Sequence, residues 1–283
     1  MSVAARRRAA SRTIRLDRSL EALPLFRLSD SSDGDAISLA DAQGNRWRVL
    51  PAPDDRMPGT FDQDVYVELL RRFNEADDPP DGVISFTLHS FLRAMGRRVD
   101  GRTYEQLRNA LGRLERTTLE SSGMYESATR QPDGPLRFTL LSAVAIERRR
   151  AADSEQLTLF QSMTSSEPGV ARVVLSAMVR GNLAAGHVVS LSAPCYWSLA
   201  SPVARRLYRL LEVARAEERL TWRIGLDKLA EQLPLSQRYP SHLQRVLQPA
   251  HDMLIAAGVL RNAVMRQQRR EWFVDYMLGS RPA

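Results

Sequence analysis

Apolar residues recur at helical spacing from residue 60 onward, and the first such stretch has a recognisable beginning. Thr60 and Gln63 have the spacing of a capping box, in which two side chains satisfy free backbone N–H groups at the start of a helix. Asp62 and Asp64 suit the positive end of the helix dipole at the same place. The pattern predicts a helix that ends before Pro79 and buries Phe61, Val65, Leu69 and Phe73.

The elements that follow are short and closely spaced. Residues 83–86 form a β-type run, Thr87 is a candidate N-cap, and a second helix carries the apolar stripe Leu88, Phe91, Leu92 and Met95. After a turn at 96–101, a third helix runs from Arg102 to about Thr117, with a buried seam of Tyr104, Leu107, Leu111 and Leu114. Apolar positions on both sides of the turn 133–135 predict a β-ribbon. Helix, strand, helix, turn, helix and ribbon is the order of a winged helix.

The second half of the chain repeats this order. Ser201 as N-cap and Pro202 as the first helical residue open a helix. A short strand at 221–224 and a helix at 226–233 follow, and a last helix ends at Gly258, which suits a left-handed C-cap. Two further strands, 259–264 and 272–276, would flank a basic turn at 266–270.

The two halves also align at a nearly constant offset. The strand and second helix of the first half lie 138 positions before those of the second, as shown by Phe86, Leu88, Phe91 and Met95 against Ile224, Leu226, Leu229 and Leu233. The third-helix seam lies 139 positions before Leu243, Val246, Ala250 and Met253. All amphipathic helices share one period, so chance agreement is the alternative, but the matching strand and ribbon favour a tandem fold.

These patterns predict an α+β protein with two tandem winged-helix domains and a basic N-terminal arm. Residues 1–28 contain seven arginines, six of them within the first 18 residues, and little apolar periodicity before Leu23, so we expect a flexible arm, with phosphate contact and mere solubilisation as equal alternatives. The Ser-rich segment 162–168 marks the domain boundary, which gives an N-terminal domain at 29–165 and a C-terminal domain at 166–283.

The net charge of the chain indicates which class of partner it binds. Lys and Arg number 40 against 33 acidic residues, for a net charge of +7 and a pI of about 10.1. Such a balance indicates a polyanion partner, although a GC-rich genome would also raise the arginine content. Lys228 is the single lysine and follows Asp227, so the phosphate-binding GxxxxGK[ST] loop of nucleotide hydrolases is absent.

Several other functions are not expected. Cys195 is the one cysteine, and the four histidines form no metal-ligand pair, so we expect no metal, no other cofactor and no enzymatic activity. No apolar run approaches the ~20 residues of a membrane span, and no signal peptide is visible. We therefore expect a cytoplasmic protein.

The third helix of each half has a polar face suited to reading DNA. At about 100° per residue, the side opposite the seam carries side chains that make bidentate hydrogen bonds to guanine and adenine edges. In the first half these are Arg102, Gln106, Asn109 and Arg113, with Thr103 at the helix start. The alternative is that this polar face only contacts water. The helix and turn that precede it favour the recognition of DNA bases.

On the last helix, Ser241, Gln244, Arg245 and Gln248 occupy the corresponding side, with Arg238 and Tyr239 at its N-terminal end. Pro249 cannot donate a backbone hydrogen bond, so we expect a kink near the middle of this helix. In the basic turn, Arg266, Arg269 and Arg270 would contact phosphate or the minor groove, or would form a solvated turn.

Particular sequence blocks resemble a known family. The run Ala204-Arg-Arg-Leu-Tyr-Arg-Leu210 with the downstream Trp222-Arg-Ile224, and the earlier Asp100-Gly-Arg-Thr-Tyr-Glu-Gln-Leu107, resemble the plasmid replication initiator family called replication initiator protein A. The resemblance covers roughly residues 47–278. The arginine-rich arm and residues 211–218 depart from the family pattern.

The resemblance implies a sequence-specific binder of double-stranded DNA at repeated origin sites of a plasmid or secondary replicon. It further implies opening of adjacent AT-rich DNA and recruitment of host replication proteins, with the host initiator and the helicase or its loader as candidates. A homodimer and repression of its own promoter stay open. Two alternatives are a winged-helix transcriptional repressor without origin function and a protein-interaction scaffold.

Overall fold

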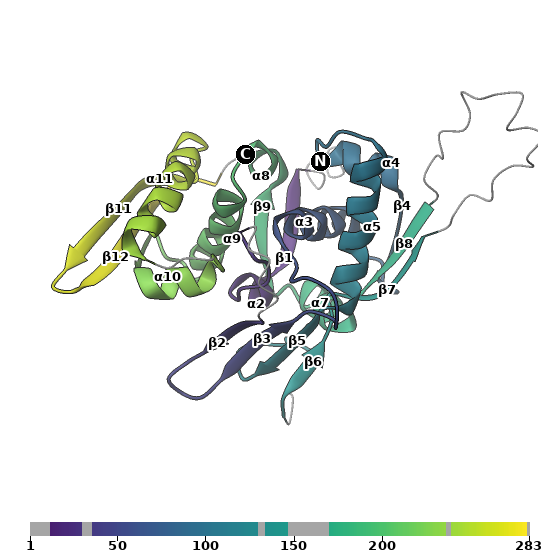
Figure 1. The fold of residues 1–283 in the computed structure, drawn as a ribbon, viewed down its shortest axis with the longest axis horizontal. Helices are drawn as coiled ribbons and strands as arrows, with labels where there is room; N and C mark the ends of the chain where they lie inside the picture. The colour runs from purple at the N-terminus through teal and green to yellow at the C-terminus, as the bar shows by residue number, and fades with distance from the viewer. Residues whose placement is uncertain (1–11, 30–35, 130–133, 147–169, 236–238, 282–283) are drawn as a thin grey trace, which may run out of the picture.

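The computed structural model describes residues 12–29, 36–129, 134–146, 170–235 and 239–281 (Figure 1). Within this part of the chain, the buried apolar residues form one continuous core that extends through both halves. No helix among the described residues is long and apolar enough to cross a membrane.

The first half contains a unit of three helices and three strands, which we call the N-terminal unit. Its helices are α3 (Thr60–Glu75), α4 (Leu88–Ala94) and α5 (Gly101–Arg116). Its strands are β4 (Val83–Thr87), β7 (Leu141–Ile146) and β8 (Val170–Leu175), paired antiparallel in the order β4-β8-β7. Buried apolar and exposed polar residues alternate along the strands of this sheet. The core side carries Ile84, Phe86, Ala171 and Val173, and the outer side carries Ser85 and Arg172.

The second half repeats the arrangement in what we call the C-terminal unit. Its helices are α9 (Pro202–Ala216), α10 (Leu226–Gln232) and α11 (Pro240–Ala256). Its strands are β10 (Thr221–Gly225), β11 (Leu260–Gln268) and β12 (Glu271–Leu278), in the order β10-β12-β11. In both units the last strand therefore lies between the other two, and the β11–β12 hairpin extends from one end of the molecule (Figure 1).

The strand partners of the first half correct the predicted ribbon. β5 (Thr118–Ser122) and β6 (Leu136–Phe138) do not complete the N-terminal unit. They pair with β2 (Ile37–Ala40) and β3 (Arg46–Leu50) in a separate sheet of order β2-β3-β5-β6, which we call the insertion sheet. The sheet lies at one edge of the molecule (Figure 1). The runs on the two sides of the turn do pair, as β5 with β6, but the N-terminal unit takes its own hairpin from β7 and β8, which lie far apart in the sequence.

The predicted domain boundary is corrected by the same pairing. The Ser-rich segment 162–168 lies outside the described residues, but it connects β7 to β8 and is therefore internal to the N-terminal unit. β8, which was expected in the C-terminal domain, is the central strand of the first sheet. The two units are instead joined by α7 (Ala177–Ala184), β9 (Val188–Ser192) and α8 (Ala193–Ser198).

Residues 12–28 are part of the core, so the flexible arm is wrong for this part of the chain. β1 (Thr13–Asp17) pairs antiparallel with β9, and α2 (Arg18–Glu21) follows it. Ile14, Leu16 and Leu20 are fully buried. Ile14 and Leu16 alternate with arginine as a half-buried strand requires, a signal that the arginine count obscured. Residues 1–11, the rest of the predicted arm, lie outside the described residues.

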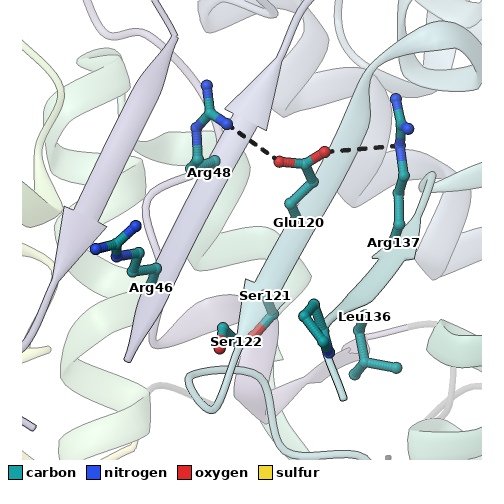
Figure 2. Close-up of a pocket in the computed structure, with 8 residues that line it drawn as sticks. Arg46, Arg48, Glu120, Ser121, Ser122, Leu136 and Arg137 are labelled. Atoms are coloured by element: carbon teal, nitrogen blue, oxygen red, sulfur yellow. Dashed lines mark hydrogen bonds and ion pairs between the residues drawn. The ribbon is translucent and has the colours of Figure 1, made fainter. Parts of the chain in front are cut away.

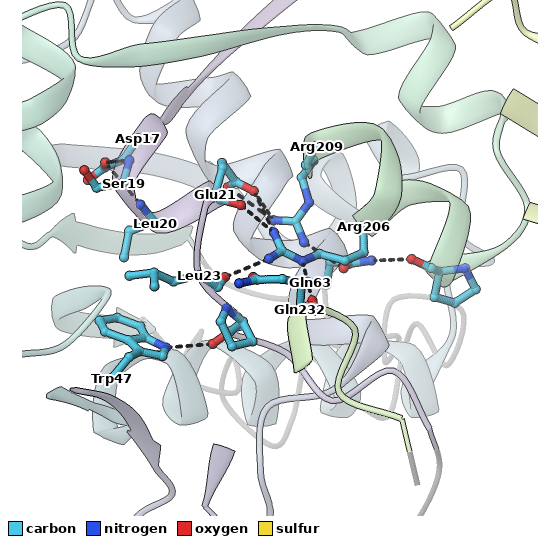
Figure 3. Close-up of polar contacts among 12 residues, drawn as sticks. Asp17, Ser19, Leu20, Glu21, Leu23, Trp47, Gln63, Arg206, Arg209 and Gln232 are labelled. Carbon is cyan, nitrogen blue, oxygen red and sulfur yellow. Dashed lines mark hydrogen bonds and ion pairs between the residues drawn. The ribbon is translucent and has the colours of Figure 1, made fainter. Parts of the chain in front are cut away.

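A buried polar cluster ties this segment to both units (Figure 3). Arg209 on α9 donates to the Glu21 carboxylate at 2.9 Å and to Gln63 Oε1 on α3 at 2.7 Å. Arg206 donates to the backbone oxygens of Glu21 and Leu23, both at 2.9 Å. The two long helices that open the units are therefore linked through α2. Gln63 serves this contact, and α3 begins one residue earlier than predicted, at the N-cap Gly59, whose backbone N–H donates to Asp62 Oδ2 at 2.7 Å.

Candidate DNA-binding surface

The start of α5 is fixed by a capping box. The Asp100 carboxylate accepts a hydrogen bond from the Thr103 backbone N–H at 2.9 Å, and Thr103 Oγ1 accepts one from the Asp100 N–H at 3.0 Å. Thr103 Oγ1 also lies 2.8 Å from the backbone oxygen of Arg98. These bonds hold the first turn of α5 and pull the pKa of Asp100 below its usual value. Thr103, a predicted DNA contact, is thus engaged in shaping the turn.

The outer face of α5 is polar and mostly exposed. Arg102 and Asn109 are exposed, as expected of reading side chains, whereas Gln106 is half-buried. Leu107, Ala110, Leu111 and Leu114 form the buried seam, and Tyr104 is only partly buried. Arg108 and Glu105 are also exposed on this helix. Neither residue was predicted from the sequence as a DNA contact. The position of Arg108, away from the buried seam, was the available signal. A carboxylate such as that of Glu105 can accept a hydrogen bond from the amino group of cytosine.

Arg113 is not on the outer face, so this predicted site residue is corrected. Its side chain is 6% exposed, and its Nη2 donates to Asp62 Oδ1 at 2.8 Å. A second bond from Nε to the same oxygen spans 3.1 Å. The angular position alone predicted exposure, but the last turns of α5 are covered by the start of α3. Arg113 therefore neutralises a buried carboxylate and is unavailable to DNA.

The third helix of the C-terminal unit presents a comparable face. Ser241, Gln244, Arg245 and Gln248 are all exposed on α11, and Gln248 donates to Asp252 at 2.9 Å. Tyr239 is the N-cap residue and is 72% exposed, while Arg238 lies outside the described residues. The helix continues through Pro249, which is exposed on the outer side.

The buried seams of the two third helices correspond at an offset of 140, not 139. Leu107, Ala110, Leu111 and Leu114 match Leu247, Ala250, His251 and Leu254. The apolar pattern concealed this register because a histidine fills a core position. His251 lies 3.0 Å from the Tyr276 hydroxyl, and burial lowers its pKa to about 4, so it packs as a neutral side chain. Arg245 consequently corresponds to Glu105, and Gln248 to Arg108.

The β11–β12 hairpin ends in a basic turn. Arg266, Arg269 and Arg270 are exposed at its tip. Arg269 has a φ of +59°, which places it in the left-handed region at the tight turn between the strands. Arg266 Nε lies 3.9 Å from Asp275 on the facing strand, a distance too long for a strong ion pair. The hairpin thus projects three guanidinium groups into solvent.

The insertion sheet carries a further basic face that was not predicted from the sequence (Figure 2). Arg48 and Arg137 lie on the two sides of Glu120 on this face, and Arg46 lies further along β3. The Glu120 carboxylate lies 3.4 Å from Arg48 and 3.7 Å from Arg137, and the residues line an open cavity of about 340 Å³. The alternation of arginine with Trp47 and Val49 along β3 is the signal that could have indicated it.

Comparison with solved structures identifies the fold. The chain is similar to domains 2 and 3 of RctB, with a TM-score of 0.57 and 13% identity over 93% of this chain and 99% of that one. It is similar also to the Pi initiator protein, whose structure was determined in complex with iteron DNA, with a TM-score of 0.52 and 12% identity over 96% of this chain and 99% of that one. The chain thus has the mixed α/β architecture of these proteins.

The sequence places the chain within a family. The replication initiator protein A family matches residues 15–253. The chain therefore belongs to the replication initiator protein A family, which confirms the resemblance. A relative from Wigglesworthia glossinidia brevipalpis, named "Putative replication protein", is 24% identical over 196 residues, which cover 68% of this chain and 63% of that protein.

Proposed function

We propose that the chain binds double-stranded DNA sequence-specifically and initiates replication at repeated origin sites of a plasmid or secondary replicon. One observation carries the proposal. The two units have the same element order and the same sheet order, and each exposes the polar face of its third helix. This repetition supports two tandem winged helices, in each of which the third helix would enter the major groove.

The exposed side chains support direct reading of bases. Arg102 and Asn109 on α5 and Gln244 and Arg245 on α11 are of the types that make paired hydrogen bonds to guanine or adenine. The arginines at the tip of the β11–β12 hairpin contact phosphate groups of the DNA backbone. Two linked units would occupy successive major grooves about 34 Å apart, and the linkage raises the affinity of the pair over either alone. The protein acts by binding, without catalytic turnover, and recruits host replication proteins.

Selection from random duplexes followed by gel-shift titration tests the reading model. We expect a preferred sequence, on which Asn109→Ala or Arg245→Ala costs about 1–3 kcal/mol and relaxes base preference at one position. Arg219→Ala, an exposed arginine in the loop before β10, is the matched control and should bind as the native protein does. Selection that yields no preferred sequence at moderate salt contradicts the model.

A replication assay separates initiation from simple repression. A circular DNA that carries the selected repeats and this gene, with no other origin, should transform a host that the same DNA without the gene does not. Arg245→Ala should lower the frequency of transformation, since its binding to the repeats is weaker by about 1–3 kcal/mol. Normal repeat binding without any transformants favours a repressor, and absence of DNA binding at low salt favours a protein-interaction scaffold.

A further inference from the structure

The structure has a second concave site, between the two units, that the reading model does not use. We call it the inter-unit cleft. It has a volume of about 530 Å³, within the range of about 300–1,000 Å³ that is usual for ligand sites. Its walls come from the α4–α5 turn and the start of α3 on one side, and from α8 and the start of α9 on the other. Ligand bound there would touch both units.

The charge of the cleft is strongly positive. Arg93, Arg97 and Arg205 line it, and Asp64 is the one acidic residue among its lining residues, so the lining carries a net charge of +2. Asp64 is 3% exposed and accepts from two of the arginines, with Arg97 at 2.8 Å. Each guanidinium has five N–H groups, and sharing one carboxylate leaves most of them for another acceptor.

Backbone dipoles add to the same field. Thr60 lies at the start of α3 and Pro202 at the start of α9, and both residues line the cleft. These helices have 16 and 15 residues, so each brings the positive end of a full helix dipole to the cavity. Helix N-termini and arginine side chains both bind phosphate in proteins.

Two of the three arginines, Arg205 and Arg97, are anchored by contacts within the fold. Arg205 is 11% exposed, donates to the Leu199 backbone oxygen at 2.8 Å, and stacks 5.4 Å from the ring centres of Tyr196 and Trp197. Arg97 lies 5.6 Å from the Phe61 ring. Such fixed positions reduce the entropy lost when a ligand binds.

We propose that the inter-unit cleft binds a phosphate group, which would contact both units at once. The phosphate comes either from the backbone of bound DNA or from a free phosphorylated molecule. The DNA source rests on the proposed function above, whereas the free source does not.

The first arm of the test uses pyrophosphate alone, measured by calorimetry and by the change in tryptophan emission, to which Trp197 in the cleft lining contributes. Arg93→Gln/Arg97→Gln removes two cations, and Ala94→Glu adds a carboxylate at an exposed lining position while it keeps every other side chain of the cleft wall. Arg98→Gln/Arg219→Gln is the matched control, because both arginines are exposed and outside the cleft. We expect both cleft variants to bind pyrophosphate at least tenfold more weakly than the control.

The second arm uses a random-sequence duplex, so that its result does not depend on base reading. If the DNA backbone supplies the phosphate, Arg93→Gln/Arg97→Gln should lower the slope of log K against log salt by about 2 relative to the control. An unchanged slope with lost pyrophosphate binding assigns a free phosphorylated molecule. Cleft variants that equal the control in both arms overturn the proposal, as does poly-glutamate binding as tight as that of pyrophosphate.

Discussion

Arginine serves two purposes in this chain, and burial separates them. Arg113, Arg206 and Arg209 are buried, and each neutralises or satisfies acceptors inside the fold. Arg102, Arg245 and Arg269 are exposed on the third helices and the hairpin. The count of 40 Lys and Arg residues therefore overstates the number of cations that are available to a polyanion, because part of the basic content holds the core together.

Arg113→Ala should destabilise the protein rather than impair base reading directly. It leaves Asp62, which is 1% exposed, without its cation, and breaking such a buried pair costs about 3–5 kcal/mol. Urea unfolding measures the loss. Arg108→Ala, an exposed neighbour on the same helix, should change stability by less than about 0.5 kcal/mol. Unchanged stability of Arg113→Ala combined with weaker DNA binding would restore the assignment that the sequence suggested.

His251 gives the stability a defined pH dependence. Its pKa falls from 6.5 to about 4 on folding, so above pH 6.5 the histidine is neutral in both states and its stabilising contribution is complete. As the pH decreases from 6.5 towards 4, the unfolded chain takes up a proton that the folded chain does not, and stability is lost.

Unfolding free energies at pH 7 and pH 4 measure this effect. The native protein should lose about 2–3 kcal/mol more than His251→Gln between the two values. Asp17 acts in the opposite direction, because burial raises its pKa to about 6 and its contribution declines as the pH rises through that value. Since Asp17 is present in both proteins, the comparison isolates His251. Parallel pH profiles would contradict the assignment of His251 as buried and neutral.

At the scale of elements, periodicity predicted helices better than it predicted strand partners. The helices α3, α4, α5, α9, α10 and α11 lie where apolar stripes and capping residues indicated, because both signals are local. Pairing is not local, and β8 joins β4 and β7 across a long connection. The site shows the same limit. Most predicted side chains on the third helices are exposed, but the burial of Arg113 depends on Asp62, which no spacing rule could have brought beside it.

The β11–β12 hairpin should contribute affinity without sequence preference. Replacing Arg266, Arg269 and Arg270 by glutamine removes three exposed cations. We expect weaker binding of all duplexes alike and a salt slope reduced by about 1 for each phosphate that the variant no longer neutralises. Arg219→Gln controls for the loss of a surface charge elsewhere. A change of base preference in the hairpin variant would instead place these arginines against base edges.

The whole molecule depends on a segment that belongs to neither unit. β1 pairs with β9, and Glu21 on α2 accepts from Arg209, whose other nitrogen reaches Gln63 on the first long helix. Because Arg209 is fully buried, its charge cannot be solvated if the carboxylate is removed. The two units are therefore expected to unfold together.

Glu21→Gln should lower the unfolding free energy by about 3–5 kcal/mol, with Glu126→Gln, an exposed carboxylate, as the control. Deletion of residues 1–28 should abolish the single cooperative transition, since it also strips β9 of its partner strand. Circular dichroism during urea titration follows both variants. A deletion variant that unfolds at the native midpoint would support the detached arm that the sequence suggested.

The central position of β8 changes how this protein can be dissected. A protease cut anywhere between β7 and β8 severs the chain inside the first sheet, so the carboxyl-terminal fragment carries away the strand that the amino-terminal fragment needs. The nicked halves should therefore elute together from a sizing column and separate only in denaturant. Expressed one at a time, they should be insoluble, and co-expression should restore a folded pair.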